Sequence, residues 1–397
     1  MGNKKCRIYA ACGVSQTPIF ITCREEKLNN KQNFINTKRI YIVGAHSRAR
    51  TLGVYLRKID PQIVITAYLV NNDEANPETI DGVPVLHFDR KIALETGNVV
   101  YLGTRGIYHD ELKKELERIG MHNIIPVTPQ LDCELRNQYL LLHFREQGRS
   151  FEKLDDLTFF SDDDHKCTEA IGKIYIIKSA FDKTLQSSYV EPVYTEYLQV
   201  GAALTEMRIA AVTDDTGENI SKRNKQFCEL TGLYWLWKHA TDEVIGLEHY
   251  RRHFLLPDDW QRRMQDHHID VILPTPLYVA PSLAQNYRER HTASDWEYMT
   301  EYVRKQDQAE YNRMMDFFEN TGLYSPCNMF IMRKEILDEL CEWLFPILFA
   351  CAEHGGERED QYQNRYPGFM SERLITYYFE ANREKYKVVY ADKNFLL

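Results

Sequence analysis

Short β-rich runs that alternate with helical patterns constrain the fold of this chain more than any other feature. Between residues 38 and 130, runs such as RIYIV (residues 39–43) and IVITAYLV (residues 63–70) alternate with helical patterns, one of which covers residues 110–119. Strands that alternate with helices in this way are typical of a parallel sheet in an α/β domain. We therefore predict a Rossmann-like domain over residues 38–130.

The residues that follow these strands are candidates for contact with a ligand. In a parallel α/β sheet, ligands bind outside the carboxyl ends of the strands. Gly44 and Ser47 follow the first run, Asn71 follows the second, and Gly103 follows the run VVYL. The first turn reads GAHSRAR and not a glycine-rich loop, which weakens the case for a diphosphate at this turn. Two interpretations stay open: a working ligand site, and a structural or regulatory sheet without a ligand.

A second α/β pattern begins at residue 173. Apolar strand runs at residues 173–177, 209–212 and 244–247 are interspersed with helical patterns such as residues 228–239, which predicts one α/β sheet with irregular insertions. The predicted fold class is α/β throughout. The acidic run at residues 162–164 precedes this pattern and is typical of a solvated linker. The predicted organisation is an N-terminal extension (residues 1–37), the Rossmann-like domain (38–130), a linker or helical connection (131–172) and a second α/β domain (173–397).

A dense group of polar residues follows the apolar strand at residues 244–247. Two adjacent arginines, Arg251 and Arg252, repel each other unless an anion or carboxylates lie between them. A binding site for a phosphorylated substrate accounts for this arrangement. The alternative is that one arginine forms a structural ion pair with Glu248 or Glu372. The complete group is Glu248, His249, Tyr250, Arg251 and Arg252.

Asp214, Asp215 and Asn219 lie on a loop that follows a predicted strand. Nucleotide contacts are common at such positions in α/β sheets. Asp and Asn also favour turns, because their side chains form hydrogen bonds with nearby backbone groups. The sequence leaves both interpretations open for each of the three residues.

Charge and cysteine content exclude several classes of protein. A net charge of -9 argues against a general nucleic-acid binder. The nine cysteines include no CxxC pair and match neither a disulfide framework nor a zinc site, which favours reduced thiols in the cytoplasm. No stretch approaches the roughly 20 apolar residues of a membrane span.

Seven ordered motifs across residues 173–390 resemble a bacterial glycosyltransferase family of capsular and exopolysaccharide gene clusters, known as domain of unknown function 4422. The motifs are QVGAAL (199–204), DDTGENIS (214–221), ELTGLYWLWK (229–238), IGLEHYRRHF (245–254), NMFIM (328–332), WLFPIL (343–348) and GFMSERL (368–374). The N-terminal domain resembles the small nucleotide-sugar-binding domain of bacterial sugar acyltransferases, through the turns at Gly44 and Gly103, the strand end at Asn71 and the segment IDGVPVL.

The first resemblance implies a GT-A-like fold and transfer of a sugar from a nucleotide-diphospho-sugar to a lipid-linked oligosaccharide. It also implies a cytoplasmic location, with peripheral association at the inner face of the membrane through assembly proteins. Two other functions stay open: a non-catalytic nucleotide-sugar sensor or assembly subunit, and a sugar-phosphate transferase.

Under this resemblance, Arg251 and Arg252 would bind the diphosphate in place of the metal that most GT-A enzymes use. Glu248 and His249 could still hold a divalent ion such as Mg or Mn, although this is not a usual magnesium ligand set. The base that accepts the proton of the acceptor hydroxyl would be Glu372, Glu248 or His249, which the sequence does not rank. The predicted substrate-binding residues are Asp214, Asp215, Asn219, Tyr250, Arg251, Arg252, Asn328 and Arg373.

Overall fold

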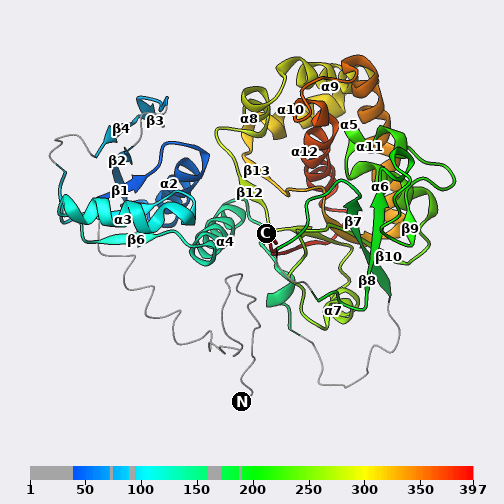
Figure 1. The fold of residues 1–397 in the computed structure, drawn as a ribbon, viewed down its shortest axis with the longest axis horizontal. Helices are drawn as coiled ribbons and strands as arrows, with labels where there is room; N and C mark the ends of the chain where they lie inside the picture. Colours follow the sequence, from blue (N-terminus) through cyan, green and yellow to red (C-terminus); the bar gives the residue numbers. More distant parts are fainter. Residues whose placement is uncertain (1–38, 72–74, 89–93, 159–170, 187–189, 397) are drawn as a thin grey trace. The chain divides into compact units, whose positions relative to one another are not determined.

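The computed structural model describes residues 39–71, 75–88, 94–158, 171–186 and 190–396 (Figure 1). The chain forms two compact units, Met1–Ser150 and Phe151–Leu397. The predicted N-terminal extension and the acidic run at residues 162–164 lie outside the described residues.

Unit 1 contains a six-stranded sheet with the order β3-β4-β2-β1-β5-β6. Its neighbouring strands are parallel except for β3, which is antiparallel to β4. The strands are β1 (Arg39–Val43), β2 (Val64–Val70), β3 (Thr79–Ile80), β4 (Val83–His87), β5 (Val99–Leu102) and β6 (Ile124–Pro126). The helices are α2 (Ser47–Ile59), η1 (Gly106–Tyr108), α3 (His109–Arg118) and α4 (Pro129–Glu146).

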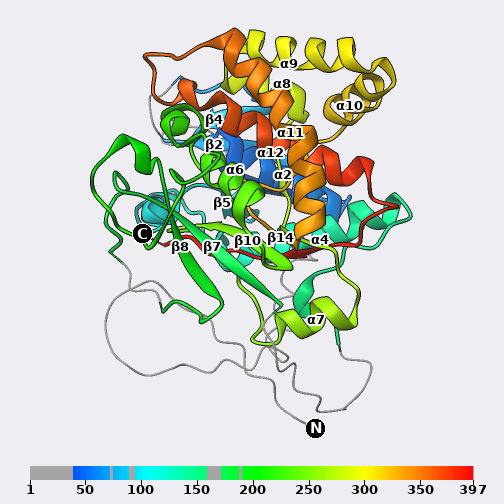
Figure 2. The ribbon, with the colours of Figure 1, turned by 90° about the vertical axis from the view of Figure 1, so that its right-hand side faces the viewer.

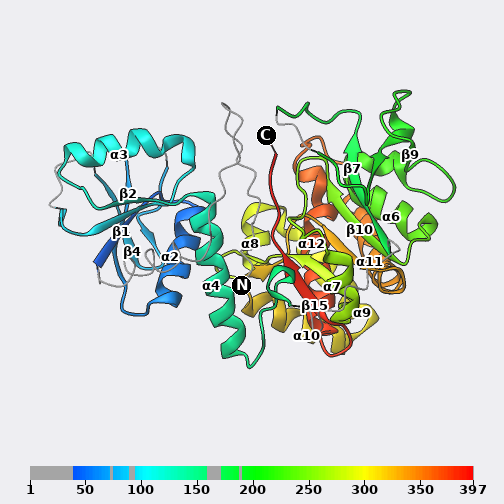
Figure 3. The same cartoon turned by 90° about the horizontal axis from the view of Figure 1, so that it is seen from below.

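Helices cover both faces of this sheet, with α3 on one face and α2 and α4 on the other (Figure 3). Strand side chains alternate between faces, and Tyr41 and Val43 of β1 pack with Leu116 of α3 in one core cluster. On the opposite face, the rings of Tyr55 and Tyr139 lie 5.0 Å apart and join α2 to α4. The first part of the predicted linker is thus the helix α4 of unit 1.

Unit 2 contains a seven-stranded sheet with the order β15-β11-β14-β10-β7-β8-β9, in which β14 is antiparallel to its neighbours β10 and β11. The strands of unit 2 are β7 (Gly172–Ser179), β8 (Thr195–Val200), β9 (Val212–Thr213), β10 (Val244–His249), β11 (Val271–Pro274), β12 (Leu277–Tyr278), β13 (Leu323–Tyr324), β14 (Phe330–Arg333) and β15 (Val388–Ala391). The helices are η2 (Leu154–Asp156), η3 (Ala202–Leu204), η4 (Ser221–Arg223), α5 (Asn224–Phe227), α6 (Leu230–His239), α7 (Trp260–Asp266), α8 (Leu283–Arg290), α9 (Ala293–Gln306), α10 (Gln308–Asn320), α11 (Lys334–Gly355), η5 (Gln363–Arg365) and α12 (Tyr366–Ala381).

The two faces of the seven-stranded sheet are covered differently (Figure 2). One face, here called the helical face, packs against α6, α11 and α12 and takes Ile245 and Leu247 of β10 into the larger core cluster. The other, here called the α7 face, takes Val244 into a smaller cluster with Trp260. Because strand side chains alternate, His249 continues the helical face and Glu248 the α7 face.

The α/β fold class predicted from the sequence is confirmed in both units. The strand predicted at residues 209–212 is shorter and later, since β9 contains only Val212 and Thr213. The backbone N–H of Ile209 donates instead to the side-chain Oε1 of Gln199 at 2.8 Å, so this residue is not part of a strand ladder. Across the part of the chain that the structure describes, no helix combines the length and apolar character that spanning a membrane requires.

Candidate functional site

The neighbouring residues Glu248 and His249 have different environments because β10 directs them to opposite faces. Glu248 is buried on the α7 face. Its Oε1 lies 2.9 Å from His253 Nδ1, and its Oε2 accepts a hydrogen bond from the backbone N–H of Phe254 at 2.9 Å. Both carboxylate oxygens therefore have partners within the fold. Glu248 and His249 therefore point to opposite faces of the sheet, and the alternative that they hold a metal stays a prediction.

His249 lies on the helical face, with its Nε2 2.6 Å from the carbonyl oxygen of Cys327. A carbonyl oxygen can only accept, so Nε2 carries a hydrogen and the neutral ring presents Nδ1 as its basic atom. Burial lowers the pKa of His249, and the negative charge of Glu229 and the Cys327 carbonyl act in the opposite direction.

A turn at Cys327 and Asn328 connects His249 to two helices. Both residues have positive φ angles, 78° and 51°, and one residue separates them from β14. Such conformations cost on the order of 1–3 kcal/mol each and persist where the surrounding structure fixes them. Here the N–H of Cys327 donates to Glu372 Oε1 at 2.6 Å, and the Asn328 amide donates to Glu229 Oε1 at 2.9 Å. Ser371 Oγ donates to Asn328 Oδ1 at 2.7 Å.

The two carboxylates that hold this turn have pKa shifts of opposite sign. For Glu229, burial favours the neutral form, but the charges of His249 and Arg365 and the Asn328 hydrogen bond outweigh it and lower the pKa. For Glu372, burial dominates and raises the pKa, against the opposing charge of Arg373. Pairs of acids whose environments separate their pKa values in this way are typical of sites that use one ionised and one proton-exchanging carboxylate.

Arg251 and Arg252 follow the carboxyl end of β10, close to this network. Within the described residues, neither guanidinium forms an ion pair with a carboxylate, so the alternative of a structural pair with Glu248 or Glu372 is not observed. Arg251 Nε is buried and has no hydrogen-bond partner there. The guanidinium of Arg251 lies 5.5 Å from the ring centroid of Tyr250 and 5.2 Å from that of Phe395. Both cations thus contact aromatic rings, and neither is ion-paired with a carboxylate of the described residues.

Three charged residues that the sequence reasoning missed belong to the same region. Glu229 precedes α6, Asp182 follows β7, and Arg365 lies in η5. Arg365 Nη2 is 4.0 Å from Glu229 Oε2. Burial raises the pKa of Asp182, and the positive charges of Arg251 and Arg365 act against this shift. The position of Asp182 three residues after the parallel strand β7 was the one available signal, since Glu229 and Arg365 follow no strand.

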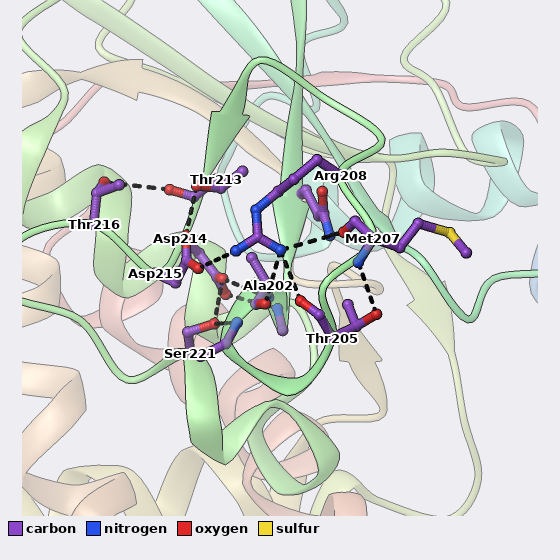
Figure 4. Close-up of polar contacts among 12 residues, drawn as sticks. Ala202, Thr205, Met207, Arg208, Thr213, Asp214, Asp215, Thr216 and Ser221 are labelled. Carbon is purple, nitrogen blue, oxygen red and sulfur yellow. Dashed lines mark hydrogen bonds and ion pairs between the residues drawn. The ribbon is translucent and has the colours of Figure 1, made fainter.

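Asp214 and Asp215 have structural partners in the loop beside β9 (Figure 4). Asp214 is completely buried and accepts from Gly201 N at 2.9 Å, Ala202 N at 3.1 Å and Ser221 Oγ at 2.5 Å. Asp215 accepts from Thr213 Oγ1 at 2.6 Å and from Arg208 Nη2 at 2.9 Å. Asn219 Oδ1 accepts from Ser221 N at 3.1 Å. The turn interpretation accounts for these contacts.

Arg373 is almost completely buried beside aromatic rings. Its Nη1 donates to the carbonyl of Phe369 at 2.8 Å and its Nη2 to Asn286 Oδ1 at 3.1 Å. The guanidinium lies 5.2 Å from the ring centroids of Tyr287 and Tyr324. Arg373 therefore acts on the network mainly through its charge, which opposes the pKa rise of Glu372.

In unit 1, the four candidate residues lie at the carboxyl edge of three neighbouring strands. The N–H of Gly44 donates to Leu69 O at 2.8 Å and that of Gly103 to Val43 O at 3.0 Å. A Cβ on Gly103 would lie 3.1 Å from the Cα of Ala49, so this glycine allows α2 to approach the sheet. Ser47 begins α2. Asn71 donates from Nδ2 to Glu115 Oε2 at 2.7 Å. Both interpretations of this edge stay predictions.

The architecture and this network define an α/β protein whose second unit fits a GT-A-like fold. A family model described as "Domain of unknown function (DUF4422)" matches residues 173–383, and the chain belongs to this family. A search among curated proteins finds no match. The resemblance of the N-terminal unit to the nucleotide-sugar-binding domain of acyltransferases stays a prediction.

A solved apo structure of WbbM, a bifunctional glycosyltransferase, is similar to this chain with a TM-score of 0.50 and 26% sequence identity. The match covers 57% of this chain and 45% of the WbbM chain, so it spans less than half of that protein. Within the described residues, no group of three or more His, Cys, Asp or Glu side chains is placed to hold a metal ion.

Proposed function

We propose that this protein is a glycosyltransferase that moves a sugar from a nucleotide-diphospho-sugar to a saccharide acceptor. The observation that carries the proposal is the pair Arg251 and Arg252, two guanidiniums without a carboxylate ion-pair partner in the described chain, near the half-buried carboxylate of Glu372, whose pKa is raised. Membership of the DUF4422 family and the similarity to WbbM, a glycosyltransferase, support the same reaction class.

The arginine pair would stabilise the leaving group. When the bond between the sugar's anomeric carbon and the diphosphate oxygen breaks, its electron pair stays on that oxygen and the diphosphate gains negative charge. Guanidiniums bind phosphate oxygens through two parallel N–H donors. Groups that are already in place where charge develops lower the barrier, because they do not have to reorganise during the reaction. The terminal N–H groups of Arg251 and Arg252 would be such donors.

Glu372 is the strongest candidate for the base. Its Oε1 is held by the N–H of Cys327, while its Oε2 is 3.9 Å from Arg373 Nη1, beyond hydrogen-bond distance. A raised pKa makes an ionised carboxylate a stronger proton acceptor. As the acceptor oxygen bonds to the anomeric carbon, its proton would pass to Glu372. Glu229 would stay ionised and hold the amide of Asn328, which fixes the turn that orients Glu372.

The finer parts of the proposal rest on the family resemblance. The acceptor would be a lipid-linked oligosaccharide in capsular or exopolysaccharide biosynthesis. The protein would act in the cytoplasm and associate peripherally with membrane assembly proteins. No metal is required by the proposed chemistry, because the two arginines supply the positive charge at the diphosphate.

The proposal is tested by incubating the protein with a panel of sugar nucleotides and saccharide acceptors and measuring nucleoside diphosphate release. Arg251→Ala is expected to lower kcat/KM about 10- to 150-fold, the loss of one hydrogen-bonded charge. Arg251→Lys should recover only part of this, because lysine lacks the planar pair of donors. Arg304→Ala, which removes an arginine paired with Glu301 at 2.7 Å on the surface of α9, is the control and should change little.

Other outcomes identify the competing functions. Release of nucleoside monophosphate would identify a sugar-phosphate transferase. Binding of sugar nucleotides without turnover, with every acceptor present, would identify a sensor or assembly subunit. Turnover that a chelator abolishes and Mg or Mn restores would show that the arginines do not replace a metal.

A further inference from the structure

The C-terminal segment of the described chain pairs with the segment that carries the two arginines. After β15, Asn394 N donates to His253 O at 2.9 Å and Leu396 N donates to Arg251 O at 2.8 Å. Phe254 and Lys393 form an antiparallel bridge. The Asn394 side chain accepts from His253 N at 2.9 Å, so the register is fixed by a side chain as well. The backbone of the arginine segment is therefore held by residues about 140 positions later in the chain.

Phe395 in this segment contacts both arginines. Its ring centroid lies 5.2 Å from the guanidinium carbon of Arg251 and 5.1 Å from that of Arg252. Both distances are within the range of about 6 Å in which a cation is attracted by an aromatic ring. The side chain is 49% exposed and belongs to neither hydrophobic cluster of unit 2. Burial in the core therefore does not explain its position.

One ring that contacts two cations offsets part of their mutual repulsion. Adjacent guanidiniums repel each other, and in the absence of an anion this repulsion favours conformations in which they separate. The negative charge density of an aromatic ring attracts each cation. A guanidinium that contacts a ring retains N–H donors in its plane for an anion. The arrangement thus keeps two positive groups together and leaves donors available.

We propose that Phe395 is a positioning residue of the diphosphate site, whose ring holds Arg251 and Arg252 side by side before the anion binds. The inference rests on the proposed function, in which these arginines bind the diphosphate. It adds a residue outside the seven sequence motifs and assigns it a physical task. Organisation of the site before binding raises affinity, because less conformational entropy is lost on association.

The test uses the full chain and titration calorimetry with inorganic pyrophosphate, followed by a panel of nucleoside diphosphates. Phe395→Ala is expected to weaken binding about 5- to 30-fold, the loss of two exposed cation–ring contacts. Phe395→Tyr keeps the ring and should bind like the wild type. Phe395→Leu keeps apolar bulk without the ring and should bind like Phe395→Ala. Tyr108→Ala, an aromatic of matched exposure at 48% in unit 1, is the control.

Each outcome decides a separate question. Wild-type affinity in Phe395→Ala, or full recovery in Phe395→Leu, would overturn the inference, since the ring would then be dispensable. If Phe395→Ala lowers the melting temperature of the chain, the affinities of Phe395→Leu and Phe395→Tyr for pyrophosphate are compared instead. Weaker binding by Phe395→Leu supports the inference, and equal binding overturns it. If binding falls in Arg251→Ala but not in the Phe395 variants, the proposed function stands and this inference fails. If the wild type binds none of the probes and releases no nucleotide, both fail.

Discussion

The raised pKa of Glu372 lowers the stability of the folded chain when the group is ionised, but it makes the carboxylate a stronger base. The Glu372 carboxylate is partly buried, with 18% of the side chain exposed, and lies near another carboxylate, Glu229; desolvation raises its pKa. Because the pKa is higher in the folded chain than in the unfolded one, the ionised form destabilises the fold. This penalty is absent below the unfolded pKa, grows as pH rises between the two values, and is complete above the folded pKa. A residue retained at such a cost is a candidate for function.

Glu372→Gln is expected to abolish the base and to stabilise the fold near neutral pH. Glutamine can still accept from the N–H of Cys327 through its Oε1, and it removes the destabilising charge. Loss of a general base lowers kcat by about 10²- to 10⁴-fold. The wild-type kcat/KM should fall as pH drops through the raised pKa of Glu372. The residual kcat/KM of the variant should not show this decrease at low pH. Steady-state kinetics and urea unfolding against pH measure both effects.

Glu248→Gln is the matched control, since Glu248 accepts from Phe254 N and contacts His253 on the opposite face of β10. We expect it to be less stable than the wild type, by about 1–3 kcal/mol for an impaired buried contact. A Glu372→Gln protein that keeps full kcat would remove Glu372 from the reaction and leave His249 as the base to test.

The sequence alone identified His249, Asn328 and Glu372, and the structure brings all three into one network. The sequence did not single out Glu229, because a carboxylate before a helix is explained by its favourable interaction with the helix dipole. The hydrogen bond between Glu229 and Asn328 depends on a turn with two positive φ angles. Neither Cys327 nor Asn328 predicts that turn in the sequence. Local pattern could not reveal a contact between residues 99 positions apart.

At the scale of elements, the loop beside β9 shows how adjacent, chemically identical residues differ. Asp214 is completely buried and accepts three hydrogen bonds, two of them from the backbone of Gly201 and Ala202. Asp215 is partly exposed and pairs with Arg208, whose side chain is 46% exposed. The sequence predicted polar contacts for both residues. It could not tell which residue would be buried, because that depends on how β9 joins the edge of the sheet.

Asp214→Ala should destabilise unit 2 much more than Asp215→Ala. Removal of the Asp214 carboxylate leaves buried N–H donors without acceptors, and we expect a loss of about 3 kcal/mol in the free energy of unfolding. Asp215→Ala removes an exposed pair, and about 1 kcal/mol or less is expected. Urea unfolding measures the difference. Unchanged stability together with lost nucleoside diphosphate binding in Asp214→Ala would favour the substrate-binding interpretation.

At the scale of the whole molecule, the α/β class could be predicted because alternating strands and helices leave a local pattern. The order of the strands in the sheet could not be predicted from the sequence. The antiparallel strand β14 lies between β10 and β11, and a strand's own sequence has the same period of two in either direction. That strand places the turn at Cys327 beside the end of β10. The position of the candidate site is thus a property of the topology.

Each unit has its own core, so the two units should unfold in separable transitions. Leu116 is completely buried in the core of unit 1. We expect Leu116→Ala to lower the stability of that unit by about 2–5 kcal/mol, the usual effect of a cavity. A ligand that binds only the folded form of a unit raises the transition of that unit. Pyrophosphate should therefore raise a transition other than the one that Leu116→Ala lowers, and scanning calorimetry measures both.

Leu236→Ala is the matched control, because Leu236 is equally buried in α6 of unit 2. It should lower the transition that pyrophosphate raises. The opposite result, in which pyrophosphate raises the transition lowered by Leu116→Ala, would place the diphosphate on the sheet of unit 1. The candidates Gly44, Ser47 and Gly103 would then form the working site, and the sensor hypothesis would replace transfer at Arg251. The experiment thus assigns the anion to one sheet without knowledge of the nucleotide.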